Sequence, residues 1–363
     1  MLRRTFLQSL PVAAATLAAA PAPEVPVKLG FDTYSLRAFR WKGIQLLEYA
    51  ASQKLDTIQF SALGDYGGLD PANLQKVKDR AAQLNISLDS GMGCICETSK
   101  SFPKNGRPAR EQLLEGLQVA KTVGAKAMRC YMGSSDDRLG PLPIEAHMEA
   151  TIKVFRSVKS EAQDLGVKIA IENHSGDMQA RETRTVIEES GKDFVGACLD
   201  TGNPVWCIED PFLTLEILAP YAVTTHVRDS IVFETPHGAA GQWVAMGDGI
   251  LDLPRFIAEF RKRCPQSTMQ LEIITGRPPR PLNYLDADFW KAFPKMPAWE
   301  FARFVALAKS GHPFMGAMVV EDITGKKPVP VMDEALKEQQ RIDLDRSFEY
   351  CRKTLNVGVN WRV

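Results

Sequence analysis

The feature that most constrains the fold is the regular return of short apolar runs rich in β-branched residues. A strand, a helix and two short loops need roughly 30 residues, and eight such units make about 250 residues, the usual size of a closed barrel. The runs are centred near residues 29, 58, 88, 128, 170, 198, 225 and 271, with steps of 27 to 46 residues. They span residues 27–34, 57–61, 86–90, 125–131, 167–172, 195–200, 223–227 and 268–273. The spacing predicts an α/β fold, a (β/α)8 TIM barrel.

The segments between these runs have helical periodicity. Leu74, Val77, Ala81 and Leu84 recur at helical spacing before the third run. Residues 144–165 form a long amphipathic segment that we expect to be one helix, ended by Gly166. The competing architecture is an open doubly wound sheet. Even spacing, and the lack of a G-x-G-x-x-G motif after the first run, favour the closed barrel.

The pattern changes after the eighth run. Residues 276–300 hold five prolines and five large aromatic residues. We expect an irregular insert there that packs its rings either over the barrel mouth or against the outer helices. Residues 301–309 and 333–355 are expected to be helical, the second forming the last covering helix. The expected organisation is a single barrel domain over residues 25–363.

The first 22 residues have the composition of an export signal. Arg3-Arg4 lead into Phe6-Leu7 and then into an uncharged, alanine-rich stretch. This order resembles a twin-arginine signal, which exports folded proteins, and it predicts a periplasmic or secreted protein. An ordinary secretory signal and a disordered tail are the alternatives, and the cleavage site is left open.

Charge and composition exclude several classes of partner. Lysine plus arginine and aspartate plus glutamate each number 44, so there is no basic excess to bind a nucleic acid backbone. No apolar run after residue 25 approaches the length that spans a bilayer, so we expect no stable membrane anchor. Seven cysteines are too few for a disulfide scaffold. Cys94 and Cys96 lack zinc-ribbon spacing, and they are expected to be structural or, at most, a minor disulfide.

Four residues able to bind a metal ion end the last four runs. They are Glu172, Asp200, His226 and Glu272. In a closed parallel barrel the carboxyl ends of all strands meet at one face, so these side chains are expected to converge. Three carboxylates brought together repel one another unless a cation compensates them. Oxygen donors with a single nitrogen favour Mn²⁺, with Mg²⁺, Co²⁺ and Fe²⁺ as alternatives. Any one of these residues, taken alone, is as consistent with an ordinary salt bridge.

The sequence around these four residues resembles the sugar phosphate isomerase/epimerase family. These are the xylose-isomerase-like barrels, which include ketose 3-epimerases and inosose dehydratases. The matching segments are residues 171–174, 199–203, 226–229, 247–252 and 271–272, so that the resemblance covers residues 27–275. It places the family's metal ligands on Glu172, Asp200, His226 and Glu272. It also implies that Glu172 and Glu272 act as the acid–base pair.

Five further residues are expected to contact substrate. His174 lies two positions after Glu172, and so on the same side of an extended segment. Asn203 stands where the epimerase branch of the family often has histidine. Arg228 and Asp229 match a basic–acidic pair that commonly follows the metal-binding histidine, and pairing with a carboxylate of the metal site is the alternative role for Arg228. Tyr34 ends the first run at the predicted mouth. Among the other histidines, we expect His147 and His312 at the surface, and His237 in a loop that could reach the mouth.

The resemblance implies a metal-dependent isomerase or epimerase of a sugar or sugar-like polyol. The reaction would move a proton next to a carbonyl through an enediolate. The same residues fit a dehydratase or lyase of keto-sugars or keto-glycosides, and a non-catalytic carbohydrate-binding barrel is the alternative from another class. The expected partner is a small carbohydrate, unphosphorylated if the protein is exported, and an oligomer is possible.

Overall fold

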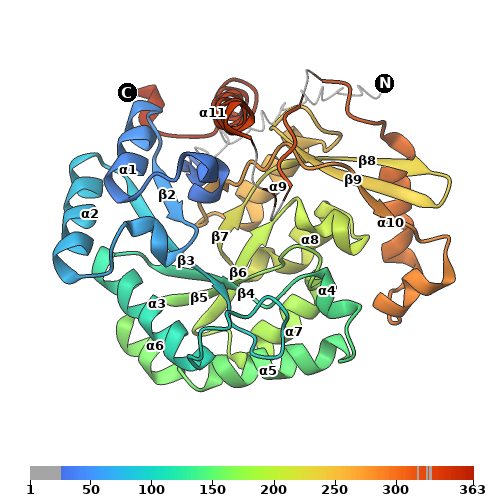
Figure 1. The fold of residues 1–363 in the computed structure, drawn as a ribbon, viewed down its shortest axis with the longest axis horizontal. Coiled ribbons are helices and arrows are strands. Elements are labelled where there is room, and N and C mark those ends of the chain that lie inside the picture. The colour runs from blue at the N-terminus through green and yellow to red at the C-terminus, as the bar shows by residue number, and fades with distance from the viewer. Residues whose placement is uncertain (1–25, 317–318, 324–325, 327–328) are drawn as a thin grey trace, which may run out of the picture.

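A computed structural model describes residues 26–316, 319–323, 326 and 329–363 of the chain. Its centre is an eight-stranded, all-parallel sheet surrounded by helices (Figure 1). The strands are β1 Leu29–Asp32, β2 Thr57–Phe60, β3 Ser87–Cys94, β4 Ala127–Tyr131, β5 Lys168–Glu172, β6 Val195–Asp200, β7 Ala222–His226 and β10 Met269–Leu271. Each lies within or overlaps one of the eight expected runs.

The sheet closes on itself into a barrel. The strand order is β10-β1-β2-β3-β4-β5-β6-β7, and a parallel bridge between Val227 and Leu271 joins its two ends. The Val227 N–H donates to the Gln270 carbonyl at 2.8 Å, and the Glu272 N–H donates to the Val227 carbonyl at 3.1 Å. Because every strand runs in the same direction, all carboxyl ends open on one face of the barrel. The (β/α)8 prediction is confirmed.

Local sequence sets the ends of the covering helices. Asp70 caps α2 by accepting from the Asn73 N–H, and Pro71 occupies the first helical position. The barrel helices are α1 Gly43–Ser52, α2 Pro71–Gln83, α3 Ala109–Val123, α4 Ser135–Arg138, α5 Ile144–Arg156, α6 Lys159–Leu165, α7 Ala180–Ser190, α8 Pro211–Leu218 and α9 Leu253–Arg263. The expected single helix over residues 144–165 is therefore two helices, broken between Arg156 and Lys159. Gly166 ends α6 with a left-handed φ of 65°, as expected of a helix stop.

A second, small sheet was not expected from the sequence. It consists of β8 Asp229–Thr235, β9 Gly238–Val244 and β11 Arg280–Leu282, all antiparallel, and lies beside the barrel (Figure 1). The aromatic insert is consequently not all irregular, since it contains β11 and a 3₁₀ turn at Ala287–Ala292. Its rings join a separate apolar core with the small sheet and α10 Ala298–Ser310.

The last helix, α11 Pro330–Lys353, covers the side of the barrel at β1, near the top of Figure 1. Phe348 packs edge-on against Phe31 with ring centroids 6.2 Å apart, and Gln340 accepts from the Ala38 N–H. Residues 1–22, the expected export signal, lie outside the described residues.

Candidate active site

The four expected metal ligands meet at the carboxyl end of the barrel. Glu172, Asp200 and His226 are the last residues of β5, β6 and β7, and Glu272 follows β10 directly. One ligand atom from each lies within 4.8 Å of all the others. All four side chains are buried. We call these four residues the quartet.

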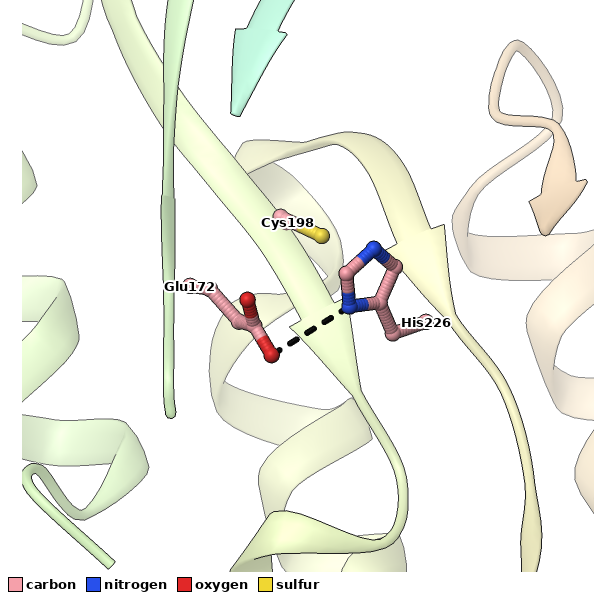
Figure 2. Close-up of side chains that lie close together, drawn as sticks. All are labelled: Glu172, Cys198 and His226. Carbon is pink, nitrogen blue, oxygen red and sulfur yellow. Dashed lines mark hydrogen bonds and ion pairs between the residues drawn. The ribbon is translucent and has the colours of Figure 1, made fainter. Parts of the chain in front are cut away.

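His226 lies at the centre of the quartet. Its Nδ1 is 3.3 Å from Glu172 Oε1, 3.5 Å from Glu272 Oε2 and 3.9 Å from Asp200 Oδ2. Figure 2 shows Glu172 and His226 directed toward each other, with the Cys198 sulfur beside the imidazole ring. Cys198 could also join Glu172 and His226 around an ion. Burial raises the pKa of its thiol to about 11, which keeps it protonated and a poor ligand at neutral pH.

Two buried arginines bind the quartet. Arg129, on β4, pairs with Glu172, and Arg228 pairs with both Asp200 and Glu272, at 2.5 Å in the second case. Asp32 also contacts His226, so four carboxylates face two guanidinium groups. In the protonation state that metal ligation requires, with His226 neutral and all four carboxylates ionised, two formal negative charges remain, and one divalent cation compensates them. The donor set and its charge therefore fit a divalent metal ion.

The pKa values of the two glutamates move in opposite directions. Burial alone would raise the pKa of Glu172, but Arg129 and His226 outweigh burial and hold that pKa well below its usual range. Burial raises the pKa of Glu272 to about 7, against the opposing attraction of Arg228 and His226. Burial would lower the pKa of His226, yet the surrounding carboxylates of Glu272, Glu172 and Asp32 raise it well above its ordinary value. The quartet as a whole favours bound positive charge.

A cavity of about 420 Å³ opens beside the quartet. Of the five expected substrate contacts, Tyr34, His174, Asn203 and Arg228 line it. Of the two expected acid–base residues, Glu272 lines it, whereas Glu172 is fully buried beneath. Glu172 has both oxygens engaged, one by Arg129 and the other by the Asn203 amide at 3.0 Å. Glu272 is therefore the better placed of the two to meet a substrate.

Asp229, the fifth expected substrate contact, is not among the residues that line the cavity. Its carboxylate is buried and accepts hydrogen bonds from the backbone N–H groups of Ser230, Gly247, Gly249 and Leu251, at 2.8 to 3.4 Å. These bonds tie the start of β8 to the loop before α9. Both carboxylate oxygens of Asp229 are occupied by these backbone N–H groups, so the side chain points into the loop and not into the cavity.

His174 has a defined orientation. Its ring stacks on Tyr131 with centroids 3.8 Å apart, and its Nδ1 is 2.8 Å from the Gly133 carbonyl. Burial lowers the pKa of His174 to about 4. The ring is therefore neutral at pH 7, and since the carbonyl requires a donor, Nδ1 carries the proton and Nε2 is the acceptor.

Arg129 and Tyr131, which end the fourth run at the predicted mouth, also line the cavity. Three further residues that line it were not indicated by the sequence pattern: Trp206, Trp243 and Arg277. Trp243 lies on β9 of the small sheet. Its ring lies against the Arg228 guanidinium, 4.3 Å from ring centroid to Cζ, and stacks on Trp206 with centroids 3.9 Å apart. A hairpin inserted between the seventh and eighth barrel strands thus supplies one wall of the site. The signal that could have indicated this hairpin is the β-rich run at residues 231–233, followed by a turn that contains Pro236 and Gly238.

The remaining histidines and the cysteines lie outside the cavity lining. His147 is buried, contrary to expectation, and its Nδ1 is 2.7 Å from the Thr98 hydroxyl. His312 is exposed as expected, and His237 is exposed near Asp286. All seven cysteines lie in the described part of the chain, buried and without a disulfide. In that same part, no helix combines the length and apolar character needed to cross a membrane.

Comparison with known proteins places this geometry in context. Residues 47–292 match the family model described as xylose isomerase-like TIM barrel. A 3-oxo-isoapionate decarboxylase from Pectobacterium atrosepticum is 24% identical over 237 residues, 62% of this chain and 77% of that protein.

Two solved structures have the same fold. A D-psicose 3-epimerase crystallised in the presence of D-fructose has a TM-score of 0.57 at 16% identity, over 90% of this chain and 99% of the other. A xylose isomerase-like TIM barrel protein from Mycobacterium smegmatis in complex with magnesium has a TM-score of 0.54 at 12% identity, over 78% and 97%.

Proposed function

Because the chain belongs to the xylose isomerase-like TIM barrel family, we propose that it is a metal-dependent isomerase or epimerase of a sugar or sugar-like polyol. The observation that carries this proposal is the quartet, whose ligand atoms lie within 4.8 Å of one another beside a cavity of about 420 Å³. A cavity of this size is ample for a monosaccharide. The 3-epimerase with the same fold supports the reaction class.

Glu172, Asp200, His226 and Glu272 would hold the metal ion, with Mn²⁺ the first choice and Mg²⁺, Co²⁺ or Fe²⁺ as alternatives. When bound, a divalent cation stabilises negative charge that develops on substrate oxygens. The magnesium complex of the M. smegmatis relative supports a divalent ion in this fold.

Glu272 is the proposed group that moves the proton, because it is the carboxylate that borders the cavity. Taking a proton from one carbon and returning it to the neighbouring carbon produces isomerisation, which one carboxylate can perform. Epimerisation requires a second group on the opposite face of the substrate. The family resemblance implies that Glu172 is this second acid–base group. The neutral His174 is the other candidate, because it borders the cavity.

The proposed substrate contacts are Tyr34, His174, Asn203 and Arg228. His174 Nε2 accepts from a substrate hydroxyl, and Tyr34 and Arg228 donate to substrate oxygens. Asn203 orients Glu172 through its amide and borders the same cavity.

A screen for incorporation of solvent deuterium tests the proposal. The full chain, loaded with Mn²⁺, is incubated in D₂O with mono- and oligosaccharides in native and 3-keto forms, and carbon-bound deuterium is measured by mass spectrometry. We expect metal-dependent incorporation into at least one sugar. Sugar binding with no incorporation in any member of the panel would instead support the non-catalytic carbohydrate-binding alternative.

A second candidate is a dehydratase or lyase acting on keto-sugars or keto-glycosides. The decarboxylase from P. atrosepticum favours it. Loss of a carboxyl group next to a carbonyl leaves an enolate and loss of a β-hydroxyl group starts from one, and a divalent cation stabilises that charge in both cases. The two candidates are separated by product mass: an isomer or epimer keeps the substrate mass, whereas the lyase product loses water, carbon dioxide or the aglycone.

We also propose export through residues 1–22 by the twin-arginine route, to the periplasm or beyond. The paired Arg3-Arg4 before Phe6-Leu7 supports this route. A reporter carrying these residues is expected to leave the cytoplasm, and a reporter with both arginines changed to lysine is expected to stay inside. Export of both reporters would favour an ordinary secretory signal.

A further inference from the structure

The two ring nitrogens of His226 have different surroundings. Nδ1 faces the carboxylates of the quartet at 3.3 to 3.9 Å. Nε2 lies 3.3 Å from Asp32 Oδ2 and in close contact with the amide nitrogen of Gln59. Because an amide nitrogen is a donor, Asp32 Oδ2 is the acceptor available to a proton on Nε2. Because the two nitrogens of an imidazole point in different directions, only one of them can face a metal held by the other three ligands.

Asp32 is itself fixed by its neighbours. It is the last residue of β1 and pairs in register with Gln59 of β2. Its Oδ1 accepts from the Tyr34 N–H at 2.9 Å, and its Oδ2 accepts from Gln59 Nε2 at 3.2 Å. Gln59 Oε1 in turn accepts from the Thr224 hydroxyl at 3.1 Å, two residues before His226 on β7. These bonds link three strands around one imidazole.

Neither Asp32 nor Gln59 borders the cavity, and both are fully buried. A substrate in the cavity therefore does not contact them. A buried carboxylate this close to a histidine nitrogen is costly unless the histidine donates to it. This contact sets the direction of the ring and leaves Nδ1 directed toward the quartet.

We infer that Asp32, supported by Gln59, is a positioning residue for the metal centre: it binds His226 at Nε2 and thereby presents Nδ1 as a metal ligand. The inference rests on the proposed function insofar as that function requires a metal at the quartet. Ligating histidines in proteins characteristically donate their second N–H to such a partner, and loss of the partner typically weakens metal binding by 10- to 100-fold.

The test compares the Mn²⁺ affinity of wild type, Asp32→Ala, Asp32→Asn and Gln59→Ala, measured on the full chain by isothermal titration calorimetry. We expect the dissociation constant to rise about 10- to 100-fold in Asp32→Ala. Asp32→Asn is expected to lose less, because its amide oxygen can still accept from Nε2. A second readout is the visible absorption spectrum of the Co²⁺-loaded protein, which reports ligand geometry and is expected to change in Asp32→Ala.

Asp56→Asn is the matched control. Asp56 is a buried carboxylate at the opposite end of the barrel, where it accepts from the backbone N–H groups of Leu29, Val359 and Asn360. The Asp56→Asn substitution is expected to lower the melting temperature and to leave the Mn²⁺ dissociation constant and the Co²⁺ absorption spectrum unchanged. An unchanged Mn²⁺ affinity in Asp32→Ala, or an equal loss of Mn²⁺ affinity in Asp56→Asn, would overturn this inference and leave the proposed function standing. Absence of Mn²⁺ binding by the wild type would overturn the proposed function and the inference together.

Discussion

Glu172 and Glu272 have different surroundings although both stand at the carboxyl end of a short apolar strand. Glu172 is enclosed by Arg129, Asn203 and His226, which engage its oxygens and keep it ionised. Glu272 contacts Arg228 and His226 but borders the cavity. The position of each glutamate could be predicted from the strand pattern. The pairing of Arg228 with a carboxylate of the quartet is one of two roles that the sequence leaves open for it. The pairing of Arg129 with Glu172 could not be predicted, because it depends on how β4 packs beside β5 and not on sequence spacing.

This difference predicts unequal effects on proton transfer. Glu272→Gln is expected to lower turnover by about 10²- to 10⁴-fold, the usual contribution of a positioned acid–base group. Glu172→Gln, measured at saturating Mn²⁺, is expected to lower it less, because Glu172 does not border the cavity. The check is the deuterium incorporation rate of each variant at matched metal occupancy. A Glu272→Gln enzyme with wild-type turnover would contradict the assignment.

At the scale of elements, the barrel strands were predictable and the small sheet was not. Each barrel strand is a buried run of mostly apolar residues, and such runs can be recognised in the sequence without knowledge of the fold. β8 and β9 instead follow directly after β7, so that their residues merge with the seventh run and the loop before α9. Because β9 was not predicted, the wall formed by Trp243 was not predicted either. Trp243 packs against Arg228, which pairs with Asp200 and Glu272.

Gly202, in the turn after β6, makes room for this arrangement. A Cβ atom at Gly202 would lie 2.5 Å from Arg228 Cδ and 2.6 Å from its Cγ, so Gly202→Ala must push the Arg228 side chain away from Asp200. We expect a destabilisation of about 1–3 kcal/mol and a higher KM. Urea unfolding and steady-state kinetics measure the two effects. Gly64→Ala is the control, since a Cβ there meets nothing within 4 Å; equal effects of the two variants would refute the steric argument.

Glu209 connects two helices and predicts a pH dependence of stability. It accepts from the Ala180 N–H at the start of α7 and from the Thr214 hydroxyl on α8. Burial raises its pKa to about 7 from an ordinary value of 4.5. The folded protein therefore holds this proton more tightly than the unfolded chain. The resulting stabilisation is complete below about pH 4.5 and is lost as the pH rises through about 7.

Glu209→Gln removes this ionisation. Between pH 4.5 and 8 we expect the wild type to lose about 3 kcal/mol of unfolding free energy relative to the variant, as measured by urea unfolding at both pH values. Glu189→Gln, an exposed position on α7, serves as the control. A difference between wild type and Glu209→Gln that does not vary with pH would show that Glu209 is not the titrating group.

At the scale of the whole molecule, the closed barrel brings residues a hundred positions apart into one cluster. Closure could be predicted from eight units of regular length, and convergence of the quartet followed from closure. That two arginines together compensate the quartet could not be predicted in this way, since only Arg228 was a candidate partner of its carboxylates. Arg129 and Arg228 offset two of the four negative charges around His226, so we expect these strands to stay together without a metal ion.

The chain is therefore expected to remain folded at 25 °C after treatment with EDTA, and to gain stability when metal is added. At free Mn²⁺ 100 times its dissociation constant, the gain is about 2.7 kcal/mol, which raises the melting temperature by a few degrees. Thermal unfolding with and without Mn²⁺ measures it. The Glu172→Gln/Glu272→Gln double variant is expected to lose the gain, since it removes two of the three carboxylates of the quartet. An equal gain in the double variant would place the bound Mn²⁺ elsewhere, and unfolding by EDTA alone would mean that the two arginines do not compensate the quartet.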